Sequence, residues 1–230
     1  MIPYRRFPAA LGAATIVLLA GCSGPTIAPM SVPVPTDAPP ARAAAEDAAV
    51  LMLAPAEVPP ADTWEAGGRL ETGSFPVSVC GVATEPVPPP SGVWASQRHN
   101  PDGDVLYQSI RPVGATQATV IVDELAAALP ACTEYQRSGV PEGHRMVVEP
   151  VGLVGTDTVA WAEADLSEPD LWYVTAFFVE RNSLVVLRTV RLSADQSLSD
   201  STTIVADAVT AVREKSAQAA GARSGFKSGR

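Results

Sequence analysis

The side chains best suited to acid–base chemistry in this chain are its two histidines, His99 and His144. A hydrolase needs a nucleophile, a base beside it and an acid that orients the base. His99 directly precedes an Asn-Pro-Asp-Gly turn and His144 follows Pro-Glu-Gly, so both are expected in exposed loops. The sequence contains no Gly-x-Ser-x-Gly nucleophile elbow. These residues predict a protein that is not an enzyme.

Oxygen ligands alternate in the turn after His99, as they do at the start of a calcium-binding loop. Asn100, Asp102 and Asp104 have the required spacing. Val105 stands where such a loop needs glycine, and Arg111 where it needs a bidentate acid. The pattern favours a polar hairpin turn without a metal.

A second acidic group surrounds a predicted turn at residues 167–169. It consists of Glu163, Asp165, Glu168 and Asp170. Such a cluster is usually a solvated loop, and a calcium or cationic-ligand site is the alternative. Glycine-rich phosphate loops and cysteines or histidines at metal-ligand spacing are absent from the sequence, so no cofactor or metal is predicted.

Aromatic side chains offer a different chemistry, because indole rings stack on sugar rings. The tryptophans are Trp64, Trp94, Trp161 and Trp172. They could line a glycan or peptidoglycan cleft, but large aromatic residues in strands mostly fill the core. Packing is the favoured interpretation.

The charge of the chain excludes one class of partner. Its 16 basic and 25 acidic residues give a formal net charge of −9. Nucleic-acid binding depends on clustered lysines and arginines, and an acidic chain is repelled by phosphate backbones. No nucleic-acid partner is predicted.

The N-terminus has the pattern of an export signal. Arg5 and Arg6 precede an uncharged apolar run that is too short to span a bilayer. The run closes on Leu19-Ala20-Gly21-Cys22, which resembles the bacterial lipobox. That resemblance implies cleavage before Cys22, acylation of its sulfur, and a membrane partner reached through the lipid anchor. General secretion is favoured over the twin-arginine route, which stays open.

Two further cysteines, Cys80 and Cys132, remain after Cys22 is assigned to lipid. In an oxidising compartment outside the cytoplasmic membrane, two such cysteines usually pair. A redox pair or a metal site is the alternative, but neither the C-x-x-C spacing nor nearby ligands are present. A structural disulfide between Cys80 and Cys132 is predicted.

The elements that position these residues divide the chain into four parts. Residues 1–21 are the lipoprotein signal peptide, and 22–43 form a proline- and alanine-rich tether expected to be extended. Residues 44–213 form the folded domain, and 214–230 are expected to be a disordered tail. The composition is typical of GC-rich actinobacterial genomes.

Within the domain, periodicity predicts an α+β fold. Helices are expected at 43–53, 116–129 and 199–213, and Asn100-Pro101-Asp102-Gly103 and Arg181-Asn182 are expected to be hairpin turns, with Asn182 in left-handed geometry. Extended segments are predicted at 92–99, 104–112, 145–154, 158–165, 171–180 and 183–192. No βαβ alternation occurs. We expect an antiparallel sheet of about five to seven strands with two main helices packed on one face.

Four segments together resemble the extracellular sensor domain of PknH-type receptor kinases. They are Pro76 to Cys80, the strand with Trp94, the helix that ends in Ala127 to Cys132, and Val179 to Val186. The resemblance would cover about residues 44–213 and departs from the family in having cysteines for only one disulfide in the domain. It implies a cleft-bearing α+β sensor or binding domain without catalysis.

These features lead to one functional expectation and two alternatives. We expect a lipid-anchored protein at the extracytoplasmic face of the cell membrane, whose sensor or ligand-binding domain recognises a cell-envelope component or a protein partner through a cleft on the open sheet face. The alternative is a structural or assembly lipoprotein of an envelope complex without a small-molecule ligand. An envelope hydrolase is the third and weakest candidate.

Overall fold

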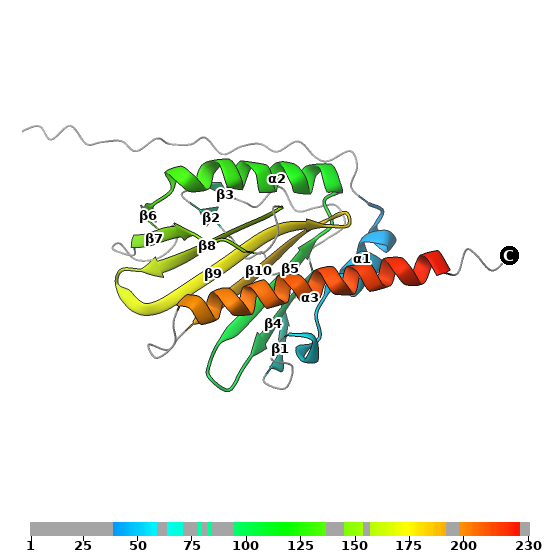
Figure 1. Cartoon of the computed structure of the whole chain (residues 1–230), viewed down its shortest axis with the longest axis horizontal. Coiled ribbons are helices and arrows are strands. Elements are labelled where there is room, and N and C mark those ends of the chain that lie inside the picture. The colour runs from blue at the N-terminus through cyan, green and yellow to red at the C-terminus, as the bar shows by residue number, and fades with distance from the viewer. Residues whose placement is uncertain are drawn as a thin grey trace, which may run out of the picture.

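The computed structural model of the chain describes residues 39–58, 64–70, 78–79, 82–83, 94–136, 145–153, 157–191 and 198–225. The predicted signal peptide, almost all of the tether, Cys22, Cys80 and His144 lie outside the described residues. Within the described residues, an eight-stranded antiparallel sheet carries helices on both faces (Figure 1). The helices are α1 (Ala41–Leu51), α2 (Ala115–Ala128) and α3 (Leu198–Gly225), with short 3-10 turns η1 (Pro55–Glu57) and η2 (Leu129–Ala131).

The strands follow the order β1-β4-β5-β10-β9-β8-β7-β6 across the sheet. They are β1 (Glu65–Leu70), β4 (Trp94–His99), β5 (Val105–Arg111), β6 (Glu134–Gln136), β7 (Arg145–Pro150), β8 (Thr158–Asp165), β9 (Glu168–Glu180) and β10 (Ser183–Arg191), and a separate pair is formed by β2 (Ser78–Val79) and β3 (Val82–Ala83). The predicted count of five to seven strands is slightly low. The unpredicted strands β1 and β6 have weak signals, since β1 contains two glycines and β6 has only three residues.

The turn between β4 and β5 forms as predicted. The Asp104 amide donates to Asn100 Oδ1 (2.7 Å), and the Gly103 amide donates to the Asn100 carbonyl (3.1 Å). Gly103 has φ 86°, a conformation that costs little without a side chain. In the β9–β10 turn the left-handed residue is Arg181, with φ 56°, so the prediction for Asn182 is wrong. Arg181 is held there by an ion pair with Asp47 of α1 (3.1 Å).

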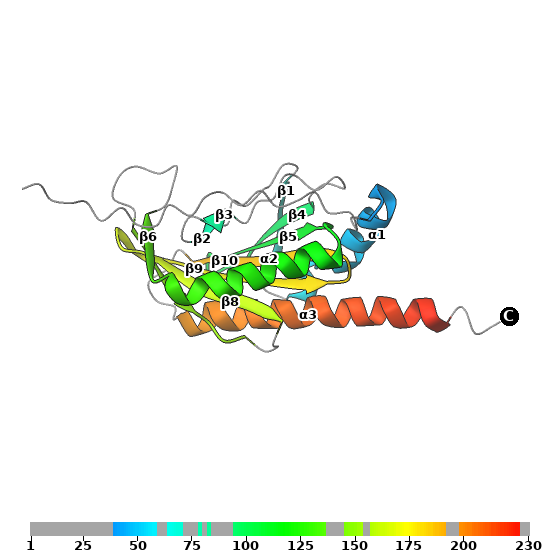
Figure 2. The ribbon, with the colours of Figure 1, turned by 90° about the horizontal axis from the view of Figure 1, so that it is seen from above.

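Strand β10 is apolar on both sides, and this decides where the helices lie. Val185 and Leu187 belong to the core that α3 covers, whereas Leu184 and Val186 belong to the core that α2 covers. Successive strand residues point to opposite faces, so such a strand must be covered on both. The prediction of two helices on one face is therefore wrong. Figure 1 shows β9 and β10 passing between α2 and α3, and Figure 2 shows the same arrangement from above.

Helix α1 shares the α3 side of the sheet, where Ala48 and Leu51 join the buried core. Helix α3 continues to Gly225, although residues 214–225 fall in the predicted disordered tail. Alanines and glutamine in this stretch are good helix formers, and Lys215 donates a hydrogen bond to the Met52 carbonyl (2.8 Å). The expected boundary at residue 213 thus lies inside a helix. In the described part of the chain, no helix is long and apolar enough to cross a membrane.

Candidate functional site

A row of five side chains crosses the α2-side face of the sheet. Strand register pairs Gln97 with Tyr107, Tyr107 with Arg188, Arg188 with Thr175, and Thr175 with Trp161. Directly paired residues of antiparallel strands lie on the same face, so these five side chains are neighbours across β4, β5, β10, β9 and β8. We call Gln97, Tyr107, Arg188, Thr175 and Trp161 the polar row.

The polar row runs from solvent into the interior. Gln97 and Tyr107 are half-buried, the Arg188 side chain is 12% exposed, and Thr175 and Trp161 are fully buried. Trp161 stacks on Phe177, with ring centres 5.3 Å apart, and this stack belongs to the apolar core under α2. The row therefore begins at half-buried residues of β4 and β5 and ends against α2.

The charge in the row is neutralised by Glu163, which is 1% exposed. Arg188 Nη2 lies 3.1 Å from Glu163 Oε2, and the Tyr135 hydroxyl donates to Glu163 Oε1 (2.5 Å). The guanidinium of Arg188 also lies 4.3 Å from the ring centre of Tyr173, a cation–π contact. Because the cation and the carboxylate cancel, this part of the sheet suits neutral polar groups of a ligand better than ions.

Among the described residues of this face, the buried side-chain atoms without a hydrogen-bond partner include Thr175 Oγ1, Trp161 Nε1 and Ser109 Oγ. Ser109 is paired with Val186, which faces α2, so its hydroxyl lies on the same face as the row. Buried polar atoms almost always have hydrogen-bond partners. These donors and acceptors are therefore unsatisfied hydrogen-bonding groups on this face of the sheet. They offer two hydroxyls and one indole N–H to a ligand or to ordered water.

The protonated hydroxyl of Tyr107 adds a further hydrogen-bonding group for a ligand to the polar row. Burial raises the pKa of the Tyr107 phenol, an effect that the charge of Arg188 partly offsets and Tyr173 adds to. The hydroxyl therefore stays protonated at neutral pH, and a tyrosine hydroxyl both donates and accepts.

His99 lies on β4 and is exposed, with a ring nitrogen 3.2 Å from the Gln97 side-chain amide. Among the described residues no group of three or more histidine, cysteine or acidic side chains could hold a metal ion. The Asn100–Asp104 turn is a structural hairpin, because Asp104 is 2% exposed and pairs with Arg191 (3.4 Å) and Asn100 Nδ2 (2.8 Å).

The structure separates the acidic cluster predicted around residues 167–169. Glu163 and Asp165 are buried, Glu168 is exposed, and the side chain of Asp170 lies outside the described set. Asp165 accepts hydrogen bonds from the Ser167 amide (2.9 Å) and hydroxyl (2.5 Å). A solvated loop is thus the wrong interpretation for Glu163 and Asp165. The alternation along β8, which places Glu163 on the face of Trp161, was the signal that could have found it.

Two of the four tryptophans confirm the packing interpretation. Trp64 and Trp161 are buried in the two cores, on opposite sides of the sheet. Trp172 is half-buried on β9. Trp94 lies in β4, and its side chain is outside the described set.

Cys132 follows η2 and is 3% exposed. It is disulfide-bonded. Cys80 lies outside the described residues, so the pairing of Cys80 with Cys132 stays a prediction.

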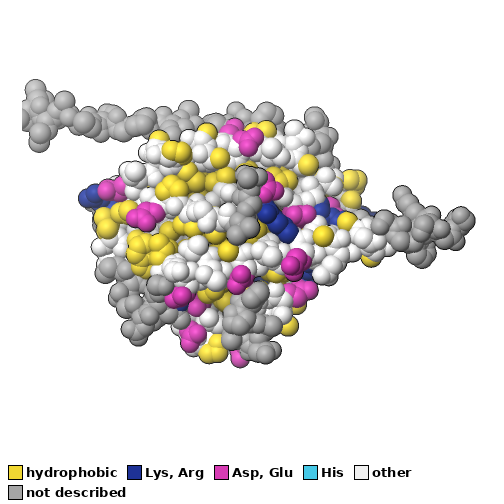
Figure 3. Space-filling view, viewed as in Figure 1, with side chains coloured by type: hydrophobic (Ala, Val, Ile, Leu, Met, Phe, Trp, Pro, Cys, Tyr) yellow, Lys and Arg dark blue, Asp and Glu magenta, His cyan; other side chains and the backbone are white. Residues whose placement is uncertain are grey.

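Charge is dispersed on the face that carries α3. On the face that carries α3, the acidic side chains coloured in Figure 3 are scattered, and the coloured basic side chains form no broad patch. This distribution agrees with the net charge and gives a nucleic acid no footprint on that face.

The antiparallel sheet with helices on both faces defines an α+β domain. The chain is similar to the solved extracellular domain of PknH from Mycobacterium tuberculosis, with a TM-score of 0.51, 15% sequence identity, and coverage of 72% of this chain and 94% of that one. This similarity confirms the predicted PknH-like fold. No family model and no curated protein matches the chain.

Proposed function

We propose that this protein is a lipoprotein, anchored through Cys22 at the extracytoplasmic face of the cell membrane, whose non-catalytic domain binds an envelope component or a protein partner along the polar row. The single observation that carries the proposal is the row itself. It joins a half-buried end at Gln97 and Tyr107 to buried, unpartnered donors and acceptors at Thr175 and Trp161. Such convergent polar groups beside an apolar surface are typical of ligand sites.

The fold similarity supports the place where the domain works. The matched PknH domain is extracellular, and the lipobox-like Leu19 to Cys22 supports the same compartment for this chain.

The test of the binding face uses intact cells that express the full chain with a photoreactive amino acid at Gln97. A matched chain carries it at Thr203, an exposed position on α3 across the sheet. The proposal predicts a discrete adduct at Gln97 and none at Thr203. Equal capture at both positions, or none at Gln97, would contradict binding along the row and favour the structural or assembly lipoprotein.

The anchor is tested separately by growing cells with an alkyne-tagged fatty acid. The wild-type chain should carry the label, and Cys22→Ala should remain unlabelled and keep its signal peptide. Labelling of the Cys22→Ala chain at the wild-type level would refute the lipid anchor. That outcome would not bear on the proposed binding along the polar row.

A further inference from the structure

The face of the sheet opposite the polar row contains a buried arginine with unused hydrogen-bonding capacity. Arg98 and Ser96 of β4 are paired with Leu106 and Gln108 of β5. Leu106 lies in the α3-side core, and the Gln108 side chain binds the backbone after α1. Arg98 therefore lies on the α3 side, and it is only 3% exposed.

The guanidinium of Arg98 has an N–H donor without a hydrogen-bond partner in the described structure. Nη1 donates to Ser96 Oγ (3.0 Å), Nε is buried and has no partner, and no ion pair to a described carboxylate forms. Burial lowers the pKa of Arg98, and the charge of Glu57 only partly offsets this. Arginine still stays protonated at neutral pH.

Three other arginines in the described part of the chain, one buried and two half-buried, form ion pairs. Arg181, Arg188 and Arg191 pair with Asp47, Glu163 and Asp104 at 3.1, 3.1 and 3.4 Å. A buried cation without an anion is costly, and the fold avoids that cost at these three positions. Arg98 differs from these three arginines, and an anion bound at its guanidinium would offset the cost of its unpaired charge.

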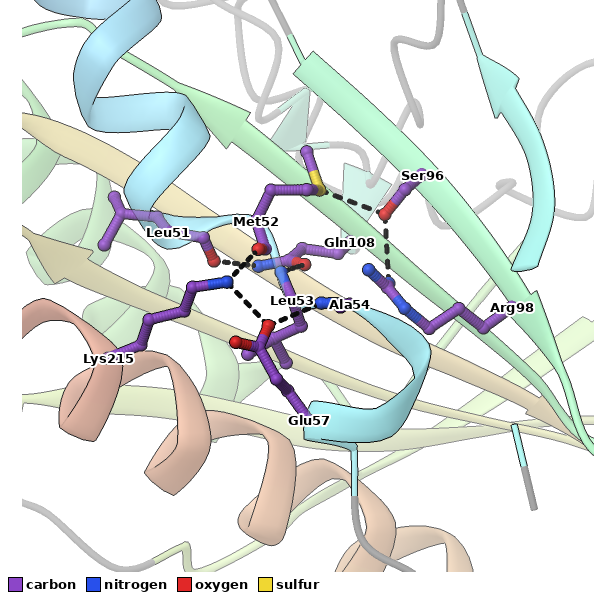
Figure 4. Close-up of polar contacts among 9 residues, drawn as sticks. All are labelled: Leu51, Met52, Leu53, Ala54, Glu57, Ser96, Arg98, Gln108 and Lys215. Atoms are coloured by element: carbon purple, nitrogen blue, oxygen red, sulfur yellow. Dashed lines mark hydrogen bonds and ion pairs between the residues drawn. The ribbon is translucent and has the colours of Figure 1, made fainter. Parts of the chain in front are cut away.

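The surroundings of Arg98 carry a second cation. Lys215 of α3 donates to the Met52 carbonyl (2.8 Å) and to Glu57 Oε2 (2.6 Å), and the same carboxylate oxygen accepts the Ala54 amide (2.6 Å). Figure 4 shows Arg98 and Lys215 on either side of the Leu53–Ala54 backbone, with Glu57 below it.

Lys215 pairs with Glu57, whereas Arg98 is influenced by the charge of that carboxylate without an ion pair to it, in a chain whose net charge is −9. The side chains of Lys215 and Glu57 are 28% and 39% exposed. The cluster consequently lies just beneath a surface that solvent reaches.

We propose that Arg98 is the centre of a binding position for one oxyanion group, a carboxylate or a phosphate, of a small ligand. The Nε edge of a guanidinium presents two parallel N–H donors that match such a group in bidentate geometry. Ser96 fixes the arginine from its other side through Nη1. Lys215 adds long-range attraction, and Glu57 opposes the incoming negative charge. This position is on the opposite face of the sheet from the polar row, so the result of its test is independent of the proposed function.

The experiment follows the arginine Nε–H resonances of the isotopically labelled full chain in detergent during titration with sodium phosphate or sodium acetate, at constant ionic strength set with chloride. We expect one Nε–H resonance to shift saturably, and Arg98→Lys, which keeps the charge, to remove that resonance and weaken binding at least tenfold. Glu57→Gln should tighten binding severalfold because it removes the competing carboxylate. Arg42→Lys is the matched control, since Arg42 is 93% exposed and should leave binding unchanged.

Each outcome decides the proposal. Saturation by phosphate alone, acetate alone or both supports an oxyanion position and distinguishes the two sources. No saturable shift with either salt would overturn it, as would equal weakening by Arg42→Lys or weaker binding in Glu57→Gln. The wild-type titration and Glu57→Gln keep the test decisive even if Arg98→Lys fails to fold.

Discussion

The carboxylate of Glu163 and the guanidinium of Arg188 lie 3.1 Å apart on the α2-side face of the sheet, and both side chains are largely buried. Removal of one member of such a pair leaves a buried charge without its partner, which typically costs about 3–5 kcal/mol of stability. We therefore expect Arg188→Met to lower the free energy of unfolding by this amount in urea denaturation.

The matched control is Arg42→Met, since Arg42 forms an exposed helical pair with Glu46 (3.1 Å). Exposed pairs of this kind contribute less than about 0.5 kcal/mol. Similar losses for the two variants would show that burial does not make Arg188 special. The double change Arg188→Met with Glu163→Leu should recover much of the lost stability, because no lone charge is left inside.

The junction after α1 depends on Gln108. Its side-chain amide donates to the Leu51 carbonyl (2.8 Å) and accepts the Leu53 amide (2.9 Å), and both hydrogen bonds are buried. Gln108→Leu leaves two backbone groups without partners, so we expect a loss of about 2–4 kcal/mol in urea denaturation. Gln218→Leu, at an exposed position of α3, should stay near wild type. A loss at Gln108 no larger than at Gln218 would contradict this role.

The sequence was sufficient for the local elements and insufficient for contacts such as this one. The Asn100 to Gly103 turn is specified by residues next to each other. The apolar run in β10 was a signal for cover on both faces, but the prediction placed both main helices on one face. Gln108 contacts Leu51 across 57 positions of the chain, and no periodicity reports that contact.

The polar row was missed for the same reason. Its five residues come from five strands, and only the register brings them together. The burial of Glu163 depends on Tyr135 and Arg188, which are distant in sequence. Acidic residues near a turn therefore suggested a solvated loop when considered alone.

The stability contributed by Glu57 should depend on pH. Partial burial acts to raise the pKa of Glu57, but hydrogen bonds from Lys215 and the Ala54 amide, together with the charges of Lys215 and Arg98, outweigh it and lower the pKa below 4.5. A carboxyl with a lowered pKa in the folded state stabilises the fold above its unfolded pKa, and this stabilisation disappears as pH falls through the folded pKa.

Thermal unfolding of wild type and Glu57→Gln tests whether the stabilisation by Glu57 disappears as the pH falls. Wild type should be the more stable protein at pH 7, by less than about 1 kcal/mol because the side chain is partly exposed. The difference should shrink once the pH falls below the ordinary pKa of glutamate. A difference that grows toward acid pH would contradict the arrangement.

The predicted disulfide between Cys80 and Cys132 closes a loop of about 50 residues, which in the chain-entropy model stabilises the fold by roughly 4 kcal/mol. Thiol labelling of the unreduced, unfolded protein should leave both cysteines unmodified, and labelling after reduction should modify both. Reduction should lower the urea midpoint. Labelling of Cys80 without reduction would refute this pairing.

Ligand binding along the polar row is tested most directly by adduct formation at Gln97 in intact cells. The measurement compares the photoadduct yield in a chain that carries Tyr107→Phe and Thr175→Val with the yield in a chain that carries Thr203→Val on the opposite side of the sheet. Loss of two hydrogen-bonding groups at about 0.5–1.5 kcal/mol each should weaken binding roughly tenfold. We predict a correspondingly reduced adduct in the row variant and an unchanged adduct in the control. An adduct of wild-type yield in the folded row variant would contradict the account.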